Sequence, residues 1–245
     1  NGIPVKACMT PVAPGMDVRS CEGLPALPDV EPPARRLAPR HDETAVTALI
    51  VGGGPAGMCA AVELGKLGID TLLVDDKEAL GGKLTLQTHN FFGSVKDCYA
   101  GVRGIDIARI LSDEIAALPS VRVWTRATAV GVYRDGAFGI VRDGVFSIVR
   151  PAQVLIATGA RERTLPFPGS GLPGVYGAGA FQTLVNRDQI RSARRLFVVG
   201  GGNVGLITAY HALQAGIQVA ALVEAMPQCG GYKVHQDKIL RLGVP

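Results

Sequence analysis

Three glycines in the first quarter of the chain have the spacing of a dinucleotide-binding turn. Gly52, Gly54 and Gly57 form a G-x-G-x-x-G pattern between a six-residue apolar run and a helical segment. In such a turn the first glycine permits a tight bend, the second lets the backbone approach a pyrophosphate, and the third lets the helix pack on the strand. Asp75 ends the next apolar run, 18 residues after Gly57, where a carboxylate can accept a hydrogen bond from a ribose hydroxyl. The pattern predicts a dinucleotide site; the alternative is a structural glycine-rich turn followed by an acidic residue.

The same arrangement occurs again near the end of the chain. Gly200, Gly202 and Gly205 repeat the pattern between an apolar run and a helical segment, and Glu224 ends the next apolar run. An acidic residue at this place accepts from the 2′-hydroxyl of NAD and repels the 2′-phosphate of NADP. The second motif therefore favours NADH, although one more residue lies between Gly216 and Glu224 than in the first unit.

Apolar periodicity predicts the elements that position these motifs. Short apolar runs that alternate with helical segments are typical of an α/β protein with buried parallel strands. The near-repeat RDGAFGIV and RDGVFSIV at residues 134–149 predicts a small antiparallel meander with Asp-Gly turns. The segment 81–104 lacks clear periodicity and is long enough to suggest a functional loop. Strands are predicted at 46–51, 71–74, 121–124, 154–160 and 219–223, helices at 58–66 and 105–118, and a strand-glycine-helix unit at 196–215.

Composition and charge disfavour several classes of protein. The hydrophobic content of 47% suffices for one large or two small domains, and no apolar run approaches the about 20 residues of a membrane span. The net charge of +4, with scattered arginines, disfavours nucleic acid as a partner. The five cysteines are odd in number and contain no C-x-x-C pair, which predicts a reducing, cytoplasmic compartment.

Several short motifs together resemble the pyridine nucleotide-disulfide reductase superfamily over residues 46–224. They are VGGGPAG at 51–57, the Gly81-Gly82 pair, the Ala157-Thr158-Gly159 run and the second glycine motif. The resemblance implies a doubly wound, Rossmann-like FAD-binding domain with a small antiparallel meander, and a second Rossmann-like domain for NAD(H). The residues that it assigns to FAD are Gly52, Gly54, Pro55, Ala56, Gly57, Asp75, Gly81, Gly82, Lys83, Val130, Thr158 and Gly159. Those that it assigns to NAD(H) are Gly200, Gly202, Asn203, Val204, Gly205 and Glu224.

The chain lacks the cysteine pair with which disulfide reductases of that superfamily accept electrons from flavin, since it has no C-x-x-C or C-x4-C. Cys59, within the first predicted helix, is interpreted as a small buried side chain. The segment 173–186 resembles FAD/NAD subunits of sarcosine oxidase, opine and proline dehydrogenase, and hydrogen cyanide synthase. This resemblance implies partner subunits in an electron-transfer assembly. It leaves the catalytic residues unknown, and for His89 a hydrogen-bonded loop histidine is favoured over a catalytic one.

The segment around Cys8, ACMTPV followed by Gly15-Met16, resembles the end of a plant-type [2Fe-2S] ferredoxin domain. By this resemblance Cys8 would ligate a cluster only in a longer parent protein; the alternative is a buried cysteine in a short strand. We therefore expect a fragment with four segments. These are a ferredoxin-like remnant at 1–22, a proline-rich linker at 23–45, an FAD-binding domain at 46–165 and an NAD-binding domain, incomplete at its C-terminus, at 166–245.

The sequence thus predicts an FAD-dependent NAD(P)H oxidoreductase that passes electrons between NAD(H), flavin and an iron-sulfur or other acceptor. One alternative is a subunit of an amine or amino-acid dehydrogenase or oxidase with a degenerate nucleotide site. The other is a structural subunit that binds nucleotide without catalysis.

Overall fold

The computed structural model describes residues 13–17, 42–90 and 93–245, which fall into two compact units, 1–39 and 40–245. In the first unit, residues 13–17 form a turn in which Met16 N donates to Ala13 O. Cys8 and most of the predicted linker lie outside the described residues. The predicted domain boundaries stay predictions.

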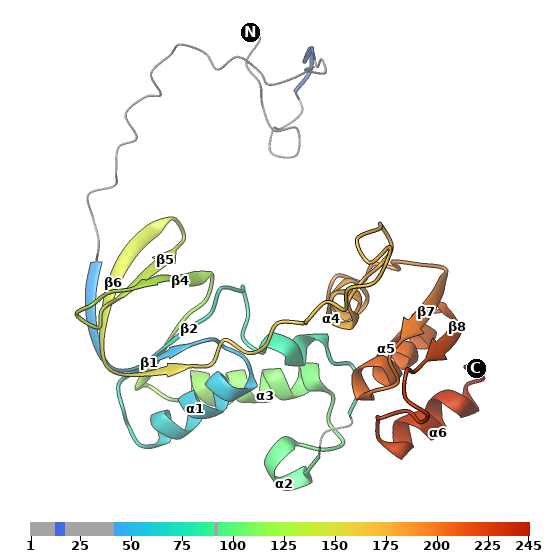
Figure 1. Cartoon of the computed structure of the whole chain (residues 1–245). Helices are drawn as coiled ribbons and strands as arrows, with labels where there is room; N and C mark the ends of the chain where they lie inside the picture. Colours follow the sequence, from blue (N-terminus) through green and yellow to red (C-terminus); the bar gives the residue numbers. More distant parts are fainter. Residues whose placement is uncertain (1–12, 18–41, 91–92) are drawn as a thin grey trace. The chain divides into compact units, whose positions relative to one another are not determined.

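A six-stranded sheet with the order β3-β2-β1-β6-β5-β4 organises the first half of the second unit (Figure 1). β1 pairs in parallel with both β2 and β6, and β2 pairs in parallel with β3. β4, β5 and β6 form an antiparallel meander. The strands are β1 (Asp42–Val51), β2 (Thr71–Val74), β3 (Val121–Trp124), β4 (Ala127–Val132), β5 (Phe138–Arg142) and β6 (Val145–Ile156). The predicted α/β class with parallel strands and a meander is confirmed.

Helices α1 (Pro55–Lys66) and α3 (Gly104–Ala116) lie side by side on the sheet (Figure 1). Their apolar residues recur at helical spacing, so each helix buries one face and leaves the other in solvent. Met58 and Ala61 of α1 pack in one cluster with Leu111 and Ile115 of α3 and with Ile50 of β1. Cys59 is exposed, so its interpretation as a buried side chain is wrong, because it lies off this apolar face of α1.

The two Asp-Gly pairs of the near-repeat do form the turns of the meander, but they form two different ones. Asp143 and Gly144 both have positive φ, 49° and 79°, as a two-residue type I′ hairpin requires. Around Gly136 (φ 82°) the turn is longer and is closed by the bond from Tyr133 N to Ala137 O. The Asp-Gly dipeptide therefore determines where each turn lies. The pairing of the strands on either side of it determines how many residues the turn contains.

Two strands differ from their predicted extent. β1 begins at Asp42, inside the predicted linker, because residues 42–46 pair with residues 147–151 of β6. Of the buried strand expected at 154–160, only residues 154–156 are strand, as the end of the long β6, and residues 157–160 follow it without strand structure. This end of β6 is not buried: Leu155 is 43% exposed and Ile156 60% exposed. Within β6, β5 pairs with residues 145–149 alone. Beyond residue 149, β1 is therefore the only strand beside β6 among the described residues.

The second half of the unit repeats the strand-turn-helix-strand arrangement. β7 (Arg195–Val199) and β8 (Gln218–Val223) pair in parallel, and α5 (Asn203–Gln214) and α6 (Lys233–Arg241) pack with them around Leu206, Ala209 and Ile239. The connecting elements are η2 (Gly82–Leu86), α2 (Val95–Cys98), α4 (Ala178–Gln182) and the π-helix η3 (Thr183–Arg187). Within the described part of the chain, no helix has both the length and the apolarity of a membrane span.

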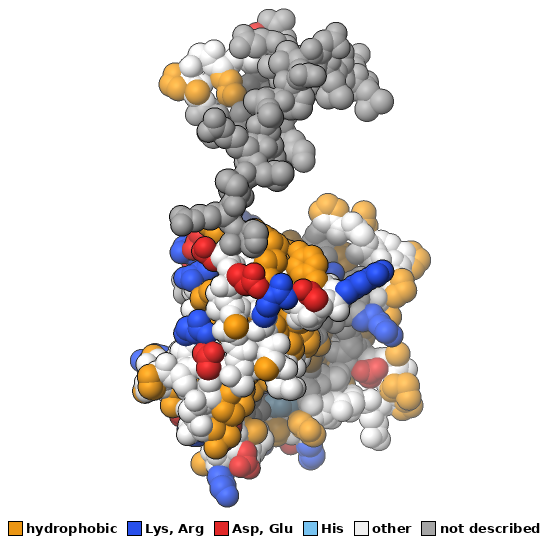
Figure 2. Space-filling view, turned by 90° about the vertical axis from the view of Figure 1, so that its left-hand side faces the viewer, with side chains coloured by type: hydrophobic (Ala, Val, Ile, Leu, Met, Phe, Trp, Pro, Cys, Tyr) orange, Lys and Arg blue, Asp and Glu red, His pale blue; other side chains and the backbone are white. Residues whose placement is uncertain are grey.

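The surface seen in Figure 2 mixes side chains of different character. Lys and Arg side chains are scattered among acidic and apolar ones over the described residues of this face. A concentrated basic area, which phosphate backbones need, is not visible on this face.

Candidate nucleotide-binding sites

The first glycine turn lies at the carboxyl edge of the sheet, where β1, β2 and β6 all end. Gly52 has a φ of 113°, which disfavours any other residue, and a Cβ at this position would overlap the carbonyl oxygen of Ala157 at the end of β6. A Cβ on Gly57 would overlap the carbonyl oxygen of Gly52. Gly54, in contrast, has open space at its Cβ position. Two glycines thus allow the turn to close, and the third leaves room for a ligand.

The N-terminus of α1 faces this open space. Gly54 is its N-cap, Pro55 occupies the first turn, and no side chain of the N-cap satisfies the helix. Backbone N–H groups in the first turn of a helix without a cap, together with the helix dipole, form a binding site for anions. The geometry fits a pyrophosphate.

Asp75 is held against the turn by two backbone N–H groups. Gly53 N donates to Oδ2 at 2.6 Å and Lys77 N donates to Oδ1 at 2.9 Å. The residue is only 9% exposed. These bonds fix the carboxylate at the end of β2, beside the turn, and each oxygen retains acceptor capacity for a ribose hydroxyl.

The Gly81-Gly82 pair closes over the same turn. Gly81 N donates to Gly53 O at 2.7 Å, and a Cβ on Gly82 would lie 2.8 Å from Gly54 Cα. Both glycines have positive φ, 123° and 51°. η2 begins here, and its second residue is Lys83.

Val130 lies in the meander, apart from the turn. On β4 its neighbours Ala129 and Gly131 pair with Ile140 and Gly139 of β5, so Val130 is the extra residue of a bulge. Its side chain is 56% exposed. The backbone N–H and C=O of the extra residue in a bulge are not paired with the neighbouring strand. They are therefore free of the ladder, as a backbone contact to an adenine base would require.

The second turn repeats the first. Gly200 has a φ of 107°, a Cβ on Gly205 would overlap Gly200 O, and the Cβ position of Gly202 is open. Gly202 is the N-cap of α5 and, like Gly54, makes no side-chain cap; Asn203 and Val204 form the first turn. The Asn203 side chain is already engaged, because its Oδ1 accepts from Tyr232 N at 2.7 Å.

Glu224 has the role in the second turn that Asp75 has in the first. Its Oε2 accepts from Gly201 N at 2.7 Å, and its Oε1 accepts from Ala225 N and Met226 N at 2.7 and 3.1 Å. The N–H groups of Met226 and then Gly201 lower the pKa of this carboxyl, so it is ionised at neutral pH.

Sequence reasoning missed a further element of the second site, the loop after Glu224. Gly231 N donates to Gly201 O at 3.0 Å, as Gly81 N does to Gly53 O, and Cys229 packs on Gly201 as Leu80 packs on Gly53. The signal was present in the sequence, because a second glycine pair follows the second acid as the first pair follows the first.

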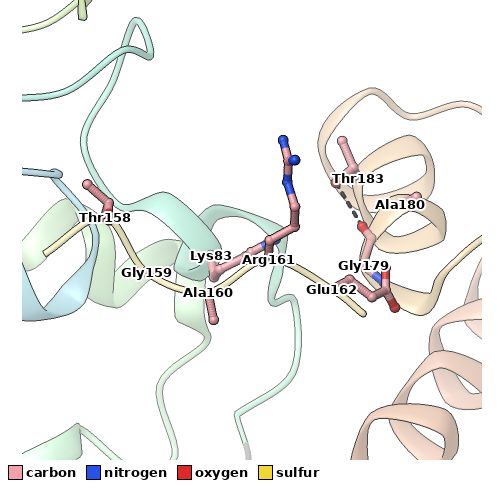
Figure 3. Close-up of a pocket in the computed structure, with 9 residues that line it drawn as sticks. All are labelled: Lys83, Thr158, Gly159, Ala160, Arg161, Glu162, Gly179, Ala180 and Thr183. Atoms are coloured by element: carbon pink, nitrogen blue, oxygen red, sulfur yellow. Dashed lines mark hydrogen bonds between the residues drawn. The ribbon is translucent and has the colours of Figure 1, made fainter. Parts of the chain in front are cut away.

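A cleft of about 560 Å³ lies beside η2, between the residues that follow β6 and helix α4 (Figure 3). Thr158 and Gly159, predicted cofactor residues, line one side of it together with Lys83, and α4 lines the other side. The Arg161 side chain extends upward in this view. Glu162 points toward Gly179, whose N–H donates to both of its carboxylate oxygens at 3.2 Å.

The N-termini of α1, α4 and α5 therefore differ in what satisfies them. Glu162 supplies an internal anion to the N-terminus of α4, whereas the N-termini of α1 and α5 have no side-chain cap on their N-cap residue. The N-terminus of α4 is therefore already satisfied by an anion of the chain itself.

The predicted FAD residues other than Val130 come together around the first turn, and the predicted NAD(H) residues come together around the second. His89 lies outside both groups: it is 7% exposed and its ring centroid is 5.4 Å from that of His211 on α5. Burial, with His235 and Lys238 nearby, lowers its pKa. Among the described residues no group of three His, Cys, Asp or Glu side chains could hold a metal ion.

Comparison with known proteins places this geometry in a family. Residues 46–241 match the family described as pyridine nucleotide-disulphide oxidoreductase. The chain is 33% identical to the sarcosine oxidase subunit alpha of Rhizobium meliloti over 196 residues, covering 74% of this chain and 19% of that protein. It is 29% identical to the hydrogen cyanide synthase subunit HcnB of Pseudomonas protegens over 209 residues, covering 80% of this chain and 41% of that protein.

A solved structure confirms the fold. The crystal structure of L-proline dehydrogenase from P. horikoshii matches with a TM-score of 0.65 at 22% identity, over 76% of this chain and 36% of that one. This chain thus spans less than half the length of these relatives.

Proposed function

Because the chain belongs to the pyridine nucleotide-disulphide oxidoreductase family, we propose that it forms part of an FAD-dependent oxidoreductase with NADH as hydride donor. The observation that carries the proposal is the repeated geometry of the two turns. Each has an open second glycine, a helix N-terminus without a side-chain cap, and a strand-end carboxylate bonded to the turn. Two such sites in one chain are what a dinucleotide cofactor and a dinucleotide substrate require.

In this proposal the first turn binds FAD. The α1 N-terminus would hold the pyrophosphate, Asp75 a ribose hydroxyl, and the Val130 backbone the adenine. Lys83, Thr158 and Gly159 would lie toward the flavin, beside the 560 Å³ cleft. Bound flavin supplies the capacity to accept a hydride and to release electrons singly; the chain supplies position and electrostatics.

The FAD assignment is tested by replacing Gly54 with leucine and measuring the FAD content of the purified protein. The added side chain would fill space that is open, so we expect the fold to persist and the flavin to be lost. Gly68→Leu is a poor control because Gly68 has a φ of 68°. Ala60→Leu, at a half-buried position of α1 away from the turn, is the better one. Full flavin content in Gly54→Leu would refute the assignment.

The nucleotide preference is tested at Glu224. The second turn would bind NADH, whose ribose 2′-hydroxyl can donate to the ionised carboxylate, while the phosphate of NADPH would be repelled. We expect flavin to be reduced faster by NADH than by NADPH, and Glu224→Arg to narrow or reverse the difference. Asp237→Asn, an acidic residue on α6 paired with Lys233, should leave the ratio unchanged. Equal rates with the two donors in the unsubstituted protein would contradict the assignment.

The similarity to a sarcosine oxidase subunit and to L-proline dehydrogenase favours a second candidate, a subunit of an amine or amino-acid dehydrogenase. In that case the second site would not deliver hydride. Anaerobic addition of NADH, then sarcosine, then proline to the flavin-loaded protein distinguishes the candidates by which donor bleaches the flavin. A flavin that none of them reduces would favour a structural subunit.

The electron outlet and partners belong to the same proposal. The chain has no C-x-x-C or C-x4-C pair, so an iron-sulfur centre or another acceptor is proposed in place of a disulfide. Two relatives are named as subunits of larger enzymes, which supports partner subunits here. Cys8 as a [2Fe-2S] ligand of a longer protein, and a cytoplasmic location, stay predictions.

A further inference from the structure

The Asn186 side chain connects two segments that belong to different nucleotide sites. It lies in the π-helix η3, and its Nδ2 is 2.6 Å from Leu86 O at the end of η2 and 3.0 Å from His211 Nδ1 on α5. The residue is half-buried, and His211 is only 1% exposed. One amide group therefore meets two partners that are far apart in the sequence.

The orientation of this amide follows from its partners. Leu86 O is a carbonyl oxygen and can only accept, so the side chain must present its NH₂ group to it. The same nitrogen faces His211 Nδ1, which must therefore be the unprotonated acceptor. The proton of a neutral His211 then resides on Nε2, a buried atom with no hydrogen-bond partner among the described residues.

Each of the two connected segments begins at a glycine turn. η2 starts at Gly82, against Gly54 of the first turn, and carries Lys83 beside the cleft. α5 starts at Asn203, directly after the second turn. Bonds that join the end of η2 to the last turn of α5 through Asn186 thus restrain the helices that follow the two turns relative to each other.

We propose that Asn186 is a positioning residue that ties the flavin-side segment η2 to the nucleotide-binding helix α5, and that this connection requires a neutral His211. The ligands assigned to the two segments rest on the proposed function; the connection itself does not. A protonated Nδ1 would direct an N–H at the NH₂ of Asn186. Rotation of the amide would satisfy His211 only by turning an oxygen toward Leu86 O.

The surroundings of His211 keep it neutral. The rings that face it are His89, from the loop after η2, at 5.4 Å, and Tyr210, on its own helix, at 6.1 Å. From α6, His235 and Lys238 act on His89. Burial, and then the proximity of His89, lower the pKa of His211 to about 4. The connection is therefore intact at neutral pH and is lost as the pH falls toward that value.

The tautomer is tested directly by ¹⁵N NMR of the imidazole nitrogens in the full chain without added cofactor. At neutral pH we expect His211 to show a protonated Nε2 and an unprotonated Nδ1. A protonated Nδ1 would overturn the proposal. Assignment by comparison with His211→Asn is suitable, because the Asn oxygen can replace Nδ1 as an acceptor but cannot titrate.

The connection is tested by amide hydrogen exchange of residues 84–90. Asn186→Ala should speed exchange in this segment by about tenfold, the change expected when one partly buried hydrogen bond is lost. Gln182→Ala is the matched control: the side chain of Gln182, on the adjoining α4, bonds Thr208 of α5 at 3.4 Å and, among the described residues, makes no bond to η2. Equal effects of the two variants, or no effect of Asn186→Ala, would overturn the proposal.

A pH series completes the test. In the unsubstituted protein, the protection of residues 84–90, which compares the measured exchange rate with the intrinsic rate of the amides at the same pH, should fall as the pH approaches 4, whereas in His211→Asn it should not. The same acid response in both proteins would contradict the requirement for a neutral histidine. These readouts do not depend on FAD, so their failure is distinct from a failure of flavin binding in the Gly54→Leu experiment.

Discussion

At the scale of single residues, the first and last positions of the glycine motif differ from the middle one in what they tolerate. A Cβ on Gly57 would overlap Gly52 O, whereas a Cβ on Gly54 would meet open space. Alanine in a helix is ordinarily favoured over glycine by about 1 kcal/mol. The overlap at Gly57 should outweigh this preference, because overpacking costs about 1–3 kcal/mol. We therefore expect Gly57→Ala to lower the free energy of unfolding and Gly54→Ala to leave it nearly unchanged. Urea unfolding of the two variants measures the difference.

The second turn offers an internal check on that prediction. A Cβ on Gly205 would overlap a backbone oxygen, as one on Gly57 would, and a Cβ on Gly202 would meet open space, as one on Gly54 would. Gly205→Ala should therefore be destabilising and Gly202→Ala nearly neutral. If all four variants had the same stability, the steric explanation of the motif would be wrong.

His211 makes stability depend on pH. Its pKa is about 4 in the folded chain and about 6.5 when unfolded, so the unfolded state binds the extra proton between these values. Stability is full above about pH 6.5, falls as the pH drops toward 4, and is lowered by at most about 3 kcal/mol. The loss of unfolding free energy over this range should be smaller in His211→Asn. An identical loss in that variant would assign the acid sensitivity to other groups.

Some of the sites could be predicted from the sequence and some could not. Gly52, Gly57 and Asp75 are recognisable because a local motif specifies both their types and their spacing. The contact between Asn186 and Leu86 joins residues 100 positions apart and has no local pattern. The apolar periodicity also could not predict whether Cys59 is buried or exposed, since a small side chain fits either face of a helix.

At the scale of elements, the N-terminus of α4 depends on a carboxylate from outside the helix. Both Glu162 oxygens accept from Gly179 N, and a Cβ on Gly177 would overlap this carboxylate. Because Glu162 is exposed, we expect Glu162→Ala to cost only about 0.5–1 kcal/mol. Glu162→Gln should cost less, since it retains an acceptor. Faster amide exchange at Gly179 in the alanine variant is the measurement, and unchanged exchange would contradict the assignment.

Elements with local signals were predicted best. β2 and β3 have the predicted bounds 71–74 and 121–124, because each is a short apolar run with turns on both sides. The start of β1 was predicted too late because its first residues, from Asp42, are polar and are strands only through pairing with β6. Local sequence cannot reveal a partner that follows about a hundred residues later.

At the scale of the whole molecule, flavin should act as a stabilising ligand. A ligand that binds only the folded state at a hundred times its Kd raises the free energy of unfolding by about 2.7 kcal/mol. We expect the Tm of the protein to rise with added FAD, and the Tm of Gly54→Leu to remain constant. A rise in both proteins would place the flavin elsewhere than the first turn.

The pairing of β1 with β6 also determines when the sheet can form during synthesis. β1 ends at Val51, and its partner on that side ends at Ile156. At the usual rate of translation the ribosome needs about 5–20 s to add the intervening residues. During that time β1 can form backbone hydrogen bonds only with β2, on one of its two edges. Its apolar side chains can be covered only by α1 and then by α3. The β7-α5-β8 unit, whose strands are close in sequence, has no such wait. The nascent chain therefore depends, for several seconds, on its earliest helices to keep its central strand from aggregation.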